Sequence, residues 1–228
     1  MTHLSIIVPV LNEAEHVAHA LFRLAPLRAR GARVIVVDGG SCDDTRALAA
    51  PLADLVLGSA RGRAVQMNAG AAVADGDALL FLHADTQLPA NADAVIAAAL
   101  RNHHWGRFDA AITGAHPMLP VIAALMNLRS RSTGIATGDQ AIFVRRASFE
   151  RIGGYAAIPL MEDIDISKRL RRVGWPACVR ARASTSGRRW EQHGVWRTIF
   201  LMWRLRLAFF LGADPRALAL DYGYTDQE

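Results

Sequence analysis

Residues 5–10 read SIIVPV, a run that is almost wholly apolar and rich in β-branched side chains. Such a run is typical of a strand that is buried on both faces of a sheet. Similar runs recur at 33–38 (RVIVVD) and 78–83 (ALLFLH), and segments with helical spacing of apolar residues lie between them. This alternation predicts an α/β fold with a mostly parallel central sheet flanked by helices.

Weaker patterns complete the predicted outline. Asn12 is suited to cap a helix that ends near Gly31, and Asp43 and Asp44 can open a short helix. The remaining patterns predict strands at 54–57, 110–113, 140–145 and 177–180, and helices at 64–74, 91–102, 119–131, 162–172 and 195–211. We expect one domain over 1–186 and a C-terminal helical extension, 187–228, that packs on it.

Composition limits the class of protein. Of the 228 residues, 52% are hydrophobic, which is enough for a packed core, and two cysteines are too few for a disulfide framework. The formal net charge is +5, but it is unevenly spread, because residues 129–206 hold 16 basic and 6 acidic groups, a net charge of +10. Such a basic segment favours an anionic partner: a phosphate, a nucleic acid or a membrane surface.

The helix predicted at 195–211 carries an aromatic stripe. At 100° per residue, one side collects Trp196, Phe200, Trp203, Leu207 and Phe210, bordered by arginines. This pattern fits contact with a membrane surface, and it equally fits a homodimer contact. The sequence shows no targeting segment and no apolar run of eighteen residues. We therefore expect a cytoplasmic protein, peripheral on the inner face of the membrane if the stripe meets lipid.

Polar side chains follow three of the predicted strands. Glu13 lies just beyond the first strand, Asp38 ends the second, and His83-Ala84-Asp85 closes the run at 78–83. Each alone could be a turn former or a helix cap. Ligands of an open parallel sheet bind beyond the carboxyl ends of its strands, so together these residues predict a site there. Asp85 is a candidate ligand of Mg²⁺ or Mn²⁺, which need few protein carboxylates when substrate phosphates complete the shell.

Two arginines flank a glycine at the start of the helix predicted at 64–74. Arg61, Gly62 and Arg63 offer guanidinium groups and backbone amides to a diphosphate, and Asn68 follows on the same helix. The first strand is followed neither by a Walker loop nor by G-x-G-x-x-G, which disfavours a Rossmann dehydrogenase.

Three carboxylates crowd the start of the helix predicted at 162–172. Repulsion among Glu162, Asp163 and Asp165 tends to raise the pKa of some of them, and a raised pKa suits a general base. The same charges also stabilise the positive end of a helix. The local pattern leaves both interpretations open.

Seven segments together resemble family-2 glycosyltransferases. They are, in chain order, SIIVPVLNEAE, VVDGGSCDDT, GRAVQMNAGA, LLFLHADT, TGDQAIFVRR, FERIGGY and PLMEDIDISKRL. RAVQMNAGA, GDQAIFVRR and SGRRWEQHGVWRT further resemble a small bacterial subgroup of short, cytosolic-facing, non-processive members. The resemblance covers nearly the whole chain. It implies a GT-A fold, which is Rossmann-like, and an inverting displacement on a nucleotide-sugar donor.

The resemblance also implies roles for individual residues. Asp163 matches the catalytic base, with Glu162 beside it, and Asp85 matches the last aspartate of the metal motif, whereas His83 stands where its first aspartate is usual. With the local patterns above, the expected nucleotide contacts are Pro9, Asn12, Glu13, Asp38, Gly39, Arg61, Arg63, Asn68 and Ala84. Acceptor or diphosphate contacts are expected from Asp139, Gln140, Arg188, Arg189, Trp190 and His193.

The expected reaction is metal-dependent, inverting transfer of a sugar from a nucleotide-sugar donor to an acceptor hydroxyl. We expect UDP as the carrier, Mn²⁺ or Mg²⁺ as the cofactor and no nucleic-acid partner; the acceptor stays open, and a lipid-linked hydroxyl is one alternative.

Two other classes remain as alternatives. A nucleotidyltransferase of similar topology would carry a glycine-rich basic loop where Leu11-Asn12-Glu13 stands, and a catalytically silent nucleotide-binding module would not need Glu162-Asp163.

Overall fold

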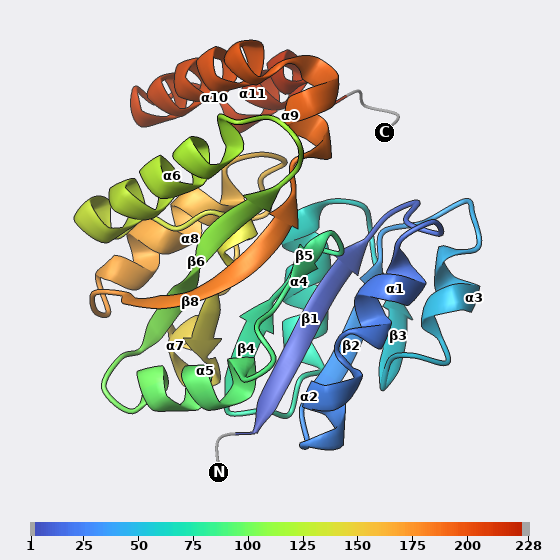
Figure 1. Ribbon diagram of the computed structural model, residues 1–228. Helices are drawn as coiled ribbons and strands as arrows, with labels where there is room; N and C mark the ends of the chain where they lie inside the picture. The colour runs from blue at the N-terminus through green and yellow to red at the C-terminus, as the bar shows by residue number, and fades with distance from the viewer. Residues whose placement is uncertain (1–2, 225–228) are drawn as a thin grey trace.

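The computed structural model describes residues 3–224, with the Arg189 side chain left out (Figure 1). Its strands form one sheet in the order β3-β2-β1-β4-β7-β6-β8-β5. Their bounds are β1 (Leu4–Val10), β2 (Arg33–Asp38), β3 (Leu55–Gly58), β4 (Ala78–Phe81), β5 (Thr86–Gln87), β6 (Trp105–Thr113), β7 (Phe143–Arg145) and β8 (Ala177–Ser186).

The sheet has a parallel half and a mixed half. Strands β3, β2, β1 and β4 are parallel to one another, whereas β7 is antiparallel to both of its neighbours. Beyond β7, β6 and β8 are again parallel, and β5 is antiparallel to β8. The α/β fold with a central sheet flanked by helices is confirmed, and the sheet is mixed.

Helices cover both faces of the sheet because side chains alternate along each strand. In β1, Ile6 and Val8 face one apolar cluster and Ile7 faces the other. The first cluster is covered by α1 (Val17–Phe22), α2 (Ala25–Ala29), α3 (Thr45–Ala49) and α5 (Ala92–Leu100). The second is covered by α4 (Arg63–Ala72), α7 (Arg146–Arg151) and α8 (Glu162–Arg171).

A further helical layer packs on β6 and extends beyond the ends of β6 and β8, at the top of Figure 1. It consists of α6 (Leu119–Thr133), α9 (Arg188–His193), α10 (Val195–Phe210) and α11 (Pro215–Tyr222). One face of α10 packs against α6 near its start and against the beginning of α8 further along. Within residues 3–224, no helix is both long and apolar enough to cross a membrane.

Several predicted elements differ from the observed ones. Asn12 caps no helix, because its φ is +52° and α1 begins only at Val17; the expected single helix is broken into α1 and α2, with Pro26 in the first turn of α2. The strand predicted at 78–83 ends at Phe81, and that predicted at 140–145 is a 3₁₀ turn, η1 (Gly138–Gln140), followed by β7.

The mixed half holds the larger differences. Strands β6 and β8 are longer than predicted, because beyond a bulge at Phe108/Asp109 their pairing continues to Thr113 and Ser186, through polar positions such as Arg182 that carry no apolar signal. Helices α9 and α11 were not predicted. The expected extension begins where β8 ends, at Ser186.

Candidate functional site

The carboxyl ends of β1 and β2 meet at one edge of the sheet, where Val10 pairs with Asp38. The Asp38 side chain is 1% exposed and accepts hydrogen bonds from the backbone N–H groups of Gly40 and Ser41. Its neighbour Gly39 lies close to Gln66: a Cβ there would be 3.0 Å from the Gln66 Cδ. The Gln66 amide in turn donates to the carbonyls of Val10 and Val37, so this turn has one defined position.

The loop after β1 is fixed to the loop after β2. The Asn12 N–H donates to Ser41 Oγ at 2.9 Å, and the Glu13 N–H donates to Thr45 Oγ1 at 2.8 Å. The pKa of Glu13 is raised, first by burial and then by the negative charge of Asp85. Glu13 and Asp85 are therefore electrostatic neighbours at the same edge, as their positions after β1 and β4 predict.

Arg63 begins α4, one of the helices that cover the second apolar cluster. Its Nη1 lies 3.2 Å from Glu162 Oε1, and its Nη2 lies 3.5 Å from the hydroxyl of Tyr224. Arg61, just before the helix, is exposed. Asn68 has a different position, because its amide group bonds the N–H and the carbonyl of Tyr155 at 2.9 and 2.8 Å. The contact of Asn68 with a nucleotide stays a prediction.

The adjacent carboxylates Glu162 and Asp163 have different surroundings at the start of α8. The Glu162 side chain is 5% exposed and pairs with Arg63. The Asp163 carboxylate accepts hydrogen bonds from the backbone N–H of Gly138 at 3.2 Å and of Ile164 at 2.7 Å. Burial, and then the charge of Glu162, raise the pKa of Asp163 to about 7. One carboxylate is thus held in an ion pair, and the other is poised to exchange a proton near neutral pH.

His83 lies against the loop that contacts Asp163. A Cβ on Gly138 would lie 2.2 Å from His83 Cε1, so the imidazole packs directly on the loop that contacts Asp163. Its Nδ1 is 3.8 Å from Asp139 Oδ1. Burial and the nearby charge of Arg63 lower the pKa of His83 to about 3, so the imidazole is neutral at physiological pH.

Asp85 is the candidate ligand for a divalent cation at this edge. Asp85 is exposed after β4, with Glu13 as its electrostatic neighbour. Over residues 3–224, no three histidine, cysteine or carboxylate side chains converge as a metal-binding group. Asp85 and Glu13 fit as ligands of Mg²⁺ or Mn²⁺ when substrate phosphates supply the other ligands. They are too few to hold a metal ion without such phosphates.

The other predicted contacts are spread more widely. Pro9 lies within β1, and Ala84 lies in the turn before Asp85. Gln140 is fully buried and donates to Asn127 Oδ1 at 3.1 Å. The Arg188 guanidinium lies 2.6 Å from His16 Nε2, next to the loop of Glu13.

The remaining predicted residues belong to α9. Trp190 packs on α6, His193 is exposed at the end of the helix, and the Arg189 side chain lies outside the described part of the chain.

Sequence reasoning missed two residues that shape the site. Glu191 accepts hydrogen bonds from the backbone N–H groups of Ala115 and His116 and so fixes α9 to the loop after β6. Tyr224 reaches Arg63 from the far end of the chain. Neither carries a local signal, because both contacts join segments far apart in the sequence.

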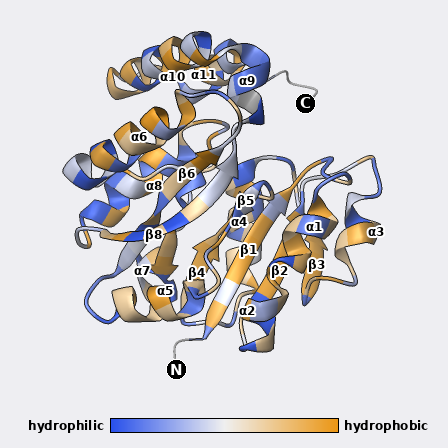
Figure 2. Cartoon of the chain, viewed as in Figure 1, coloured by the Kyte–Doolittle hydropathy of each residue, from blue (hydrophilic) through white to orange (hydrophobic). Residues whose placement is uncertain are grey.

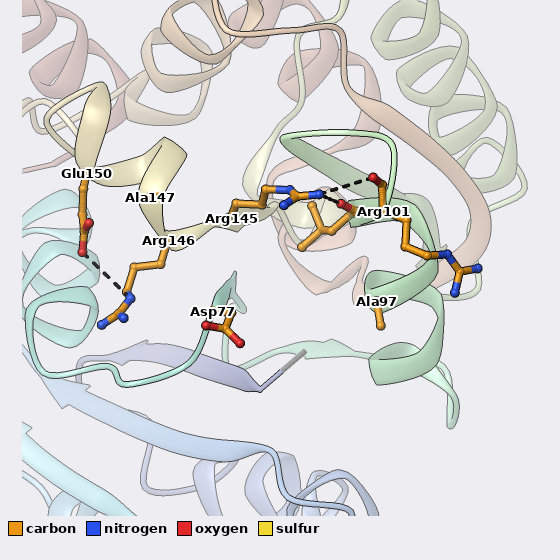
Figure 3. Close-up of a pocket in the computed structure, with 8 residues that line it drawn as sticks. Asp77, Ala97, Arg101, Arg145, Arg146, Ala147 and Glu150 are labelled. Carbon is orange, nitrogen blue, oxygen red and sulfur yellow. Dashed lines mark hydrogen bonds and ion pairs between the residues drawn. The ribbon is translucent and has the colours of Figure 1, made fainter. Parts of the chain in front are cut away.

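A cavity at the opposite end of the sheet is separate from this edge. It is lined by Asp77, which precedes β4, by Arg145, which ends β7, and by Arg146, which begins α7 (Figure 3). Arg145 donates to the carbonyls of Leu100 and Arg101, and Arg146 pairs with Glu150. Both arginines therefore have hydrogen-bond or ion-pair partners within the chain.

Residues 5–151 match the model of a protein family described as glycosyl transferase family 2. No curated protein sequence matches the chain. Among solved structures, the mannosyltransferase PcManGT from Pyrobaculum calidifontis, in complex with GDP-Man and Mn²⁺, is similar with a TM-score of 0.68 and 22% identity. The match covers 91% of this chain and 61% of that one.

Two further structures have the same fold. TarS 1–349 from S. aureus, in complex with UDP, has a TM-score of 0.63 and 18% identity, over 81% of this chain and 60% of that one. Glucosyl-3-phosphoglycerate synthase from Mycobacterium tuberculosis, in complex with Mg²⁺ and UDP, has a TM-score of 0.61 and 18% identity. This match covers 81% of this chain and 70% of that one. The chain spans about three fifths of the length of PcManGT and of TarS 1–349.

Proposed function

Because the chain belongs to glycosyltransferase family 2 and is a glycosyltransferase, we propose that it transfers a sugar from a nucleotide-sugar donor to an acceptor hydroxyl with inversion at the anomeric carbon. The observation that carries the proposal is the division between Glu162, paired with Arg63, and Asp163, whose pKa is raised to about 7. A base with such a pKa can accept a proton at neutral pH.

In the proposed reaction, Asp163 takes the proton of the acceptor hydroxyl. The hydroxyl oxygen forms a bond to the anomeric carbon as the bond from that carbon to the diphosphate oxygen breaks, and the nucleoside diphosphate leaves with both electrons of the broken bond. The two N–H groups that bond to Asp163 hold its carboxylate in one orientation. Arg63, beside Glu162, supplies positive charge on the donor side.

The proposed donor site is the edge formed by the loops after β1, β2 and β4. Glu13, Asp38 and Gly39 would bind the base and ribose, with UDP as the expected nucleotide, and Arg61 and Arg63 would face the diphosphate. Asp85, with Glu13 nearby, would hold Mn²⁺ or Mg²⁺. When bound, such a cation stabilises the negative charge of the leaving diphosphate.

We also propose that the aromatic stripe of α10 contacts an anionic membrane surface. Trp203 and Phe200 are 64% and 66% exposed, and the outer face of α6 adds Leu125 and Leu128; Figure 2 shows both helices as largely apolar. Arg197 and Arg204 border the stripe, and Arg204 also pairs with Asp221. A symmetric homodimer would bring those arginines face to face, whereas anionic lipid complements them.

Vesicle sedimentation tests the membrane proposal. Vesicles containing phosphatidylglycerol should sediment the wild-type chain, and Trp203→Ser with Phe200→Ser should weaken this binding severalfold. Loss of a dimer in the same variant, with vesicle binding unchanged, would favour the homodimer.

A nucleotide panel tests the proposed activity. UDP, GDP and CDP are compared, with and without Mn²⁺, by their effect on the melting temperature, and the sugar nucleotide of the best binder is then assayed for hydrolysis. At a hundred times its dissociation constant a ligand adds about 2.7 kcal/mol to the stability of the folded chain.

The same panel separates the other classes. Binding without any donor turnover would indicate a silent nucleotide-binding module. Release of pyrophosphate from a nucleoside triphosphate and a sugar phosphate would indicate a nucleotidyltransferase. If no nucleotide moves the melting curve, the donor site is assigned wrongly.

A further inference from the structure

We propose that Arg129 forms an anion-binding subsite on the acceptor side of Asp163, which holds a phosphate group of the acceptor. The inference rests on the proposed function, because it specifies the class of acceptor. Three arginines gather at the last turns of α6: Arg129 and Arg131 of α6 and Arg107 of β6. Their hydrogen-bond partners differ.

Two of these arginines have their hydrogen bonds within the chain. Arg107, in β6, is fully buried and bonds Ser130 Oγ and the carbonyl of Asn127. Arg131 pairs with Asp109 and donates to the carbonyl of Cys178. Both guanidinium groups stabilise the packing of α6 on the sheet.

Arg129 differs from both. Its Nε and Nη2 are buried, yet neither has a hydrogen-bond partner within the described residues. A buried N–H without an acceptor costs about 1–3 kcal/mol, so such a group in a native protein calls for a ligand or a water. Adjacent Nε and Nη2 protons form the fork that binds a phosphate or a carboxylate through two parallel hydrogen bonds.

The position of Arg129 relates it to the acceptor. Helix α6 adjoins η1, because Gln140 donates to Asn127 Oδ1, and Gly138 of η1 bonds Asp163. The negative charges of Asp163 and Asp139 and the positive charge of Arg107 act on the Arg129 guanidinium. Asp163 is the proposed base, and Asp139 adjoins the loop that contacts it. On the donor side, the charges of Arg63 and Glu162 act on each other. Arg129 therefore contributes a second positive charge near the base, in addition to the one that faces the donor.

A phosphate is the anion that fits best. Arginine keeps its charge even when partly buried, and its planar fork matches a tetrahedral oxyanion. The phosphate could belong to a soluble phosphorylated acceptor or to a lipid headgroup, and both present the same group to Arg129.

The test is phosphate binding by the full chain with its nucleotide site filled. The chain is saturated with Mn²⁺ and the nucleotide that binds best, and inorganic phosphate is titrated by calorimetry. Arg129→Gln should weaken phosphate binding by about tenfold or more, the size expected for losing charge-assisted hydrogen bonds. Nucleotide affinity should stay within about twofold. Arg172→Gln, at an exposed arginine that ends α8, is the matched control and should change neither.

Every outcome decides the inference. Phosphate binding that is absent, or unchanged in Arg129→Gln, overturns it. Should Arg129→Gln fail to fold, Arg129→Lys keeps the charge without the fork, and a loss of phosphate affinity alone would support the subsite. If no nucleotide binds, the proposed function fails, and the titration on the nucleotide-free chain still tests Arg129.

A second titration distinguishes the sources of the phosphate. Monomeric dihexanoyl phosphatidic acid should bind more tightly than inorganic phosphate if the acceptor is a lipid, and no more tightly if it is soluble. In both cases the binding should depend on Arg129.

Discussion

The parallel half of the sheet and the mixed half are stabilised by different interactions. Around β1 and β2 the core is apolar, and buried positions such as Ile35 and Val36 alternate between the two faces. Around β6 the core contains a polar network: Arg107 is fully buried with Ser130, and Asn127 bonds both the N–H and the carbonyl of Ala110.

This difference separates the two tasks of the proposed enzyme. In the parallel half, Glu13 and Asp85 stand on loops beyond strand ends, at the proposed donor site. In the mixed half, the polar network continues through Asn127 to Gln140 and so positions η1, whose Gly138 bonds the proposed base Asp163. Changes in the first half should affect donor binding, and changes near η1 should affect turnover.

The largest expected effect is on turnover, from the proposed base. Asp163→Asn should lower turnover by about 10² to 10⁴, because a positioned base is typically worth that factor. Donor affinity should stay near the wild-type value, since the ion pair of Arg63 with Glu162 remains. Steady-state turnover and nucleotide titration, measured on the same preparation, check both parts.

Glu162→Gln is the matched control for this variant. It keeps the shape but removes the partner of Arg63, so it should reduce donor affinity more than Asp163→Asn does. If Glu162→Gln abolishes turnover and Asp163→Asn leaves it intact, the two carboxylates have the opposite roles.

The next largest effect concerns the parallel half of the sheet, which carries the proposed donor site. Asp85→Asn removes a negative charge from the proposed metal site without changing its shape, so it should weaken Mn²⁺-dependent nucleotide binding by about tenfold. Binding measured in the presence of a chelator should change little. Equal losses with and without Mn²⁺ would mean that Asp85 only stabilises the turn after β4.

A smaller effect is expected on stability. Gly138→Ala places a methyl group 2.2 Å from the present position of His83 Cε1, so the two must shift apart, at a cost of about 1–3 kcal/mol. Gly58→Ala, in the parallel half, is the control, because its methyl group would make only an ordinary contact, at 3.5 Å from Arg46 Nη1. Urea unfolding compares the two variants. Equal stability would show that the packing of His83 on η1 is loose.

The smallest effect concerns the contact between the two halves through α9. Arg188→Gln removes the hydrogen bond to His16 beside the loop of Glu13. Exposed polar contacts of this kind contribute about 1 kcal/mol or less, so donor affinity should fall by no more than a few fold. A tenfold or larger loss would instead indicate that Arg188 binds the diphosphate directly.

The sequence predicted the parallel half well because its strands are continuous apolar runs with short connections. The positions of Glu13, Asp38 and Asp85 at one edge follow from parallel pairing alone, and the structure places them there. A local signal was misleading where a tertiary contact decides the structure: Asn12 resembled a helix cap, but its side chain accepts a hydrogen bond from the N–H of Cys42 in the next loop.

The mixed half was harder to predict because its order depends on long-range polar contacts. Strand β8 carries arginines at exposed positions, which hide its alternation, and the buried amide of Gln140 finds its acceptor on Asn127, in a distant helix. Glu162 and Asp163 were found as a pair, but their separate surroundings could not be assigned, since Arg63 and Gly138 reach them from distant segments.

The central claim is that Asp163 is the base and that Glu162 raises its pKa. The direct measurement is the pH dependence of kcat/KM for donor turnover, which reports the ionisation of the free enzyme. Because the base must be ionised, kcat/KM should rise with pH up to about 7 and then level off. In Glu162→Gln this rise should move to lower pH, since one cause of the raised pKa is gone, and in Asp163→Asn it should vanish from the residual activity. A rise that persists unchanged in Asp163→Asn would contradict the account.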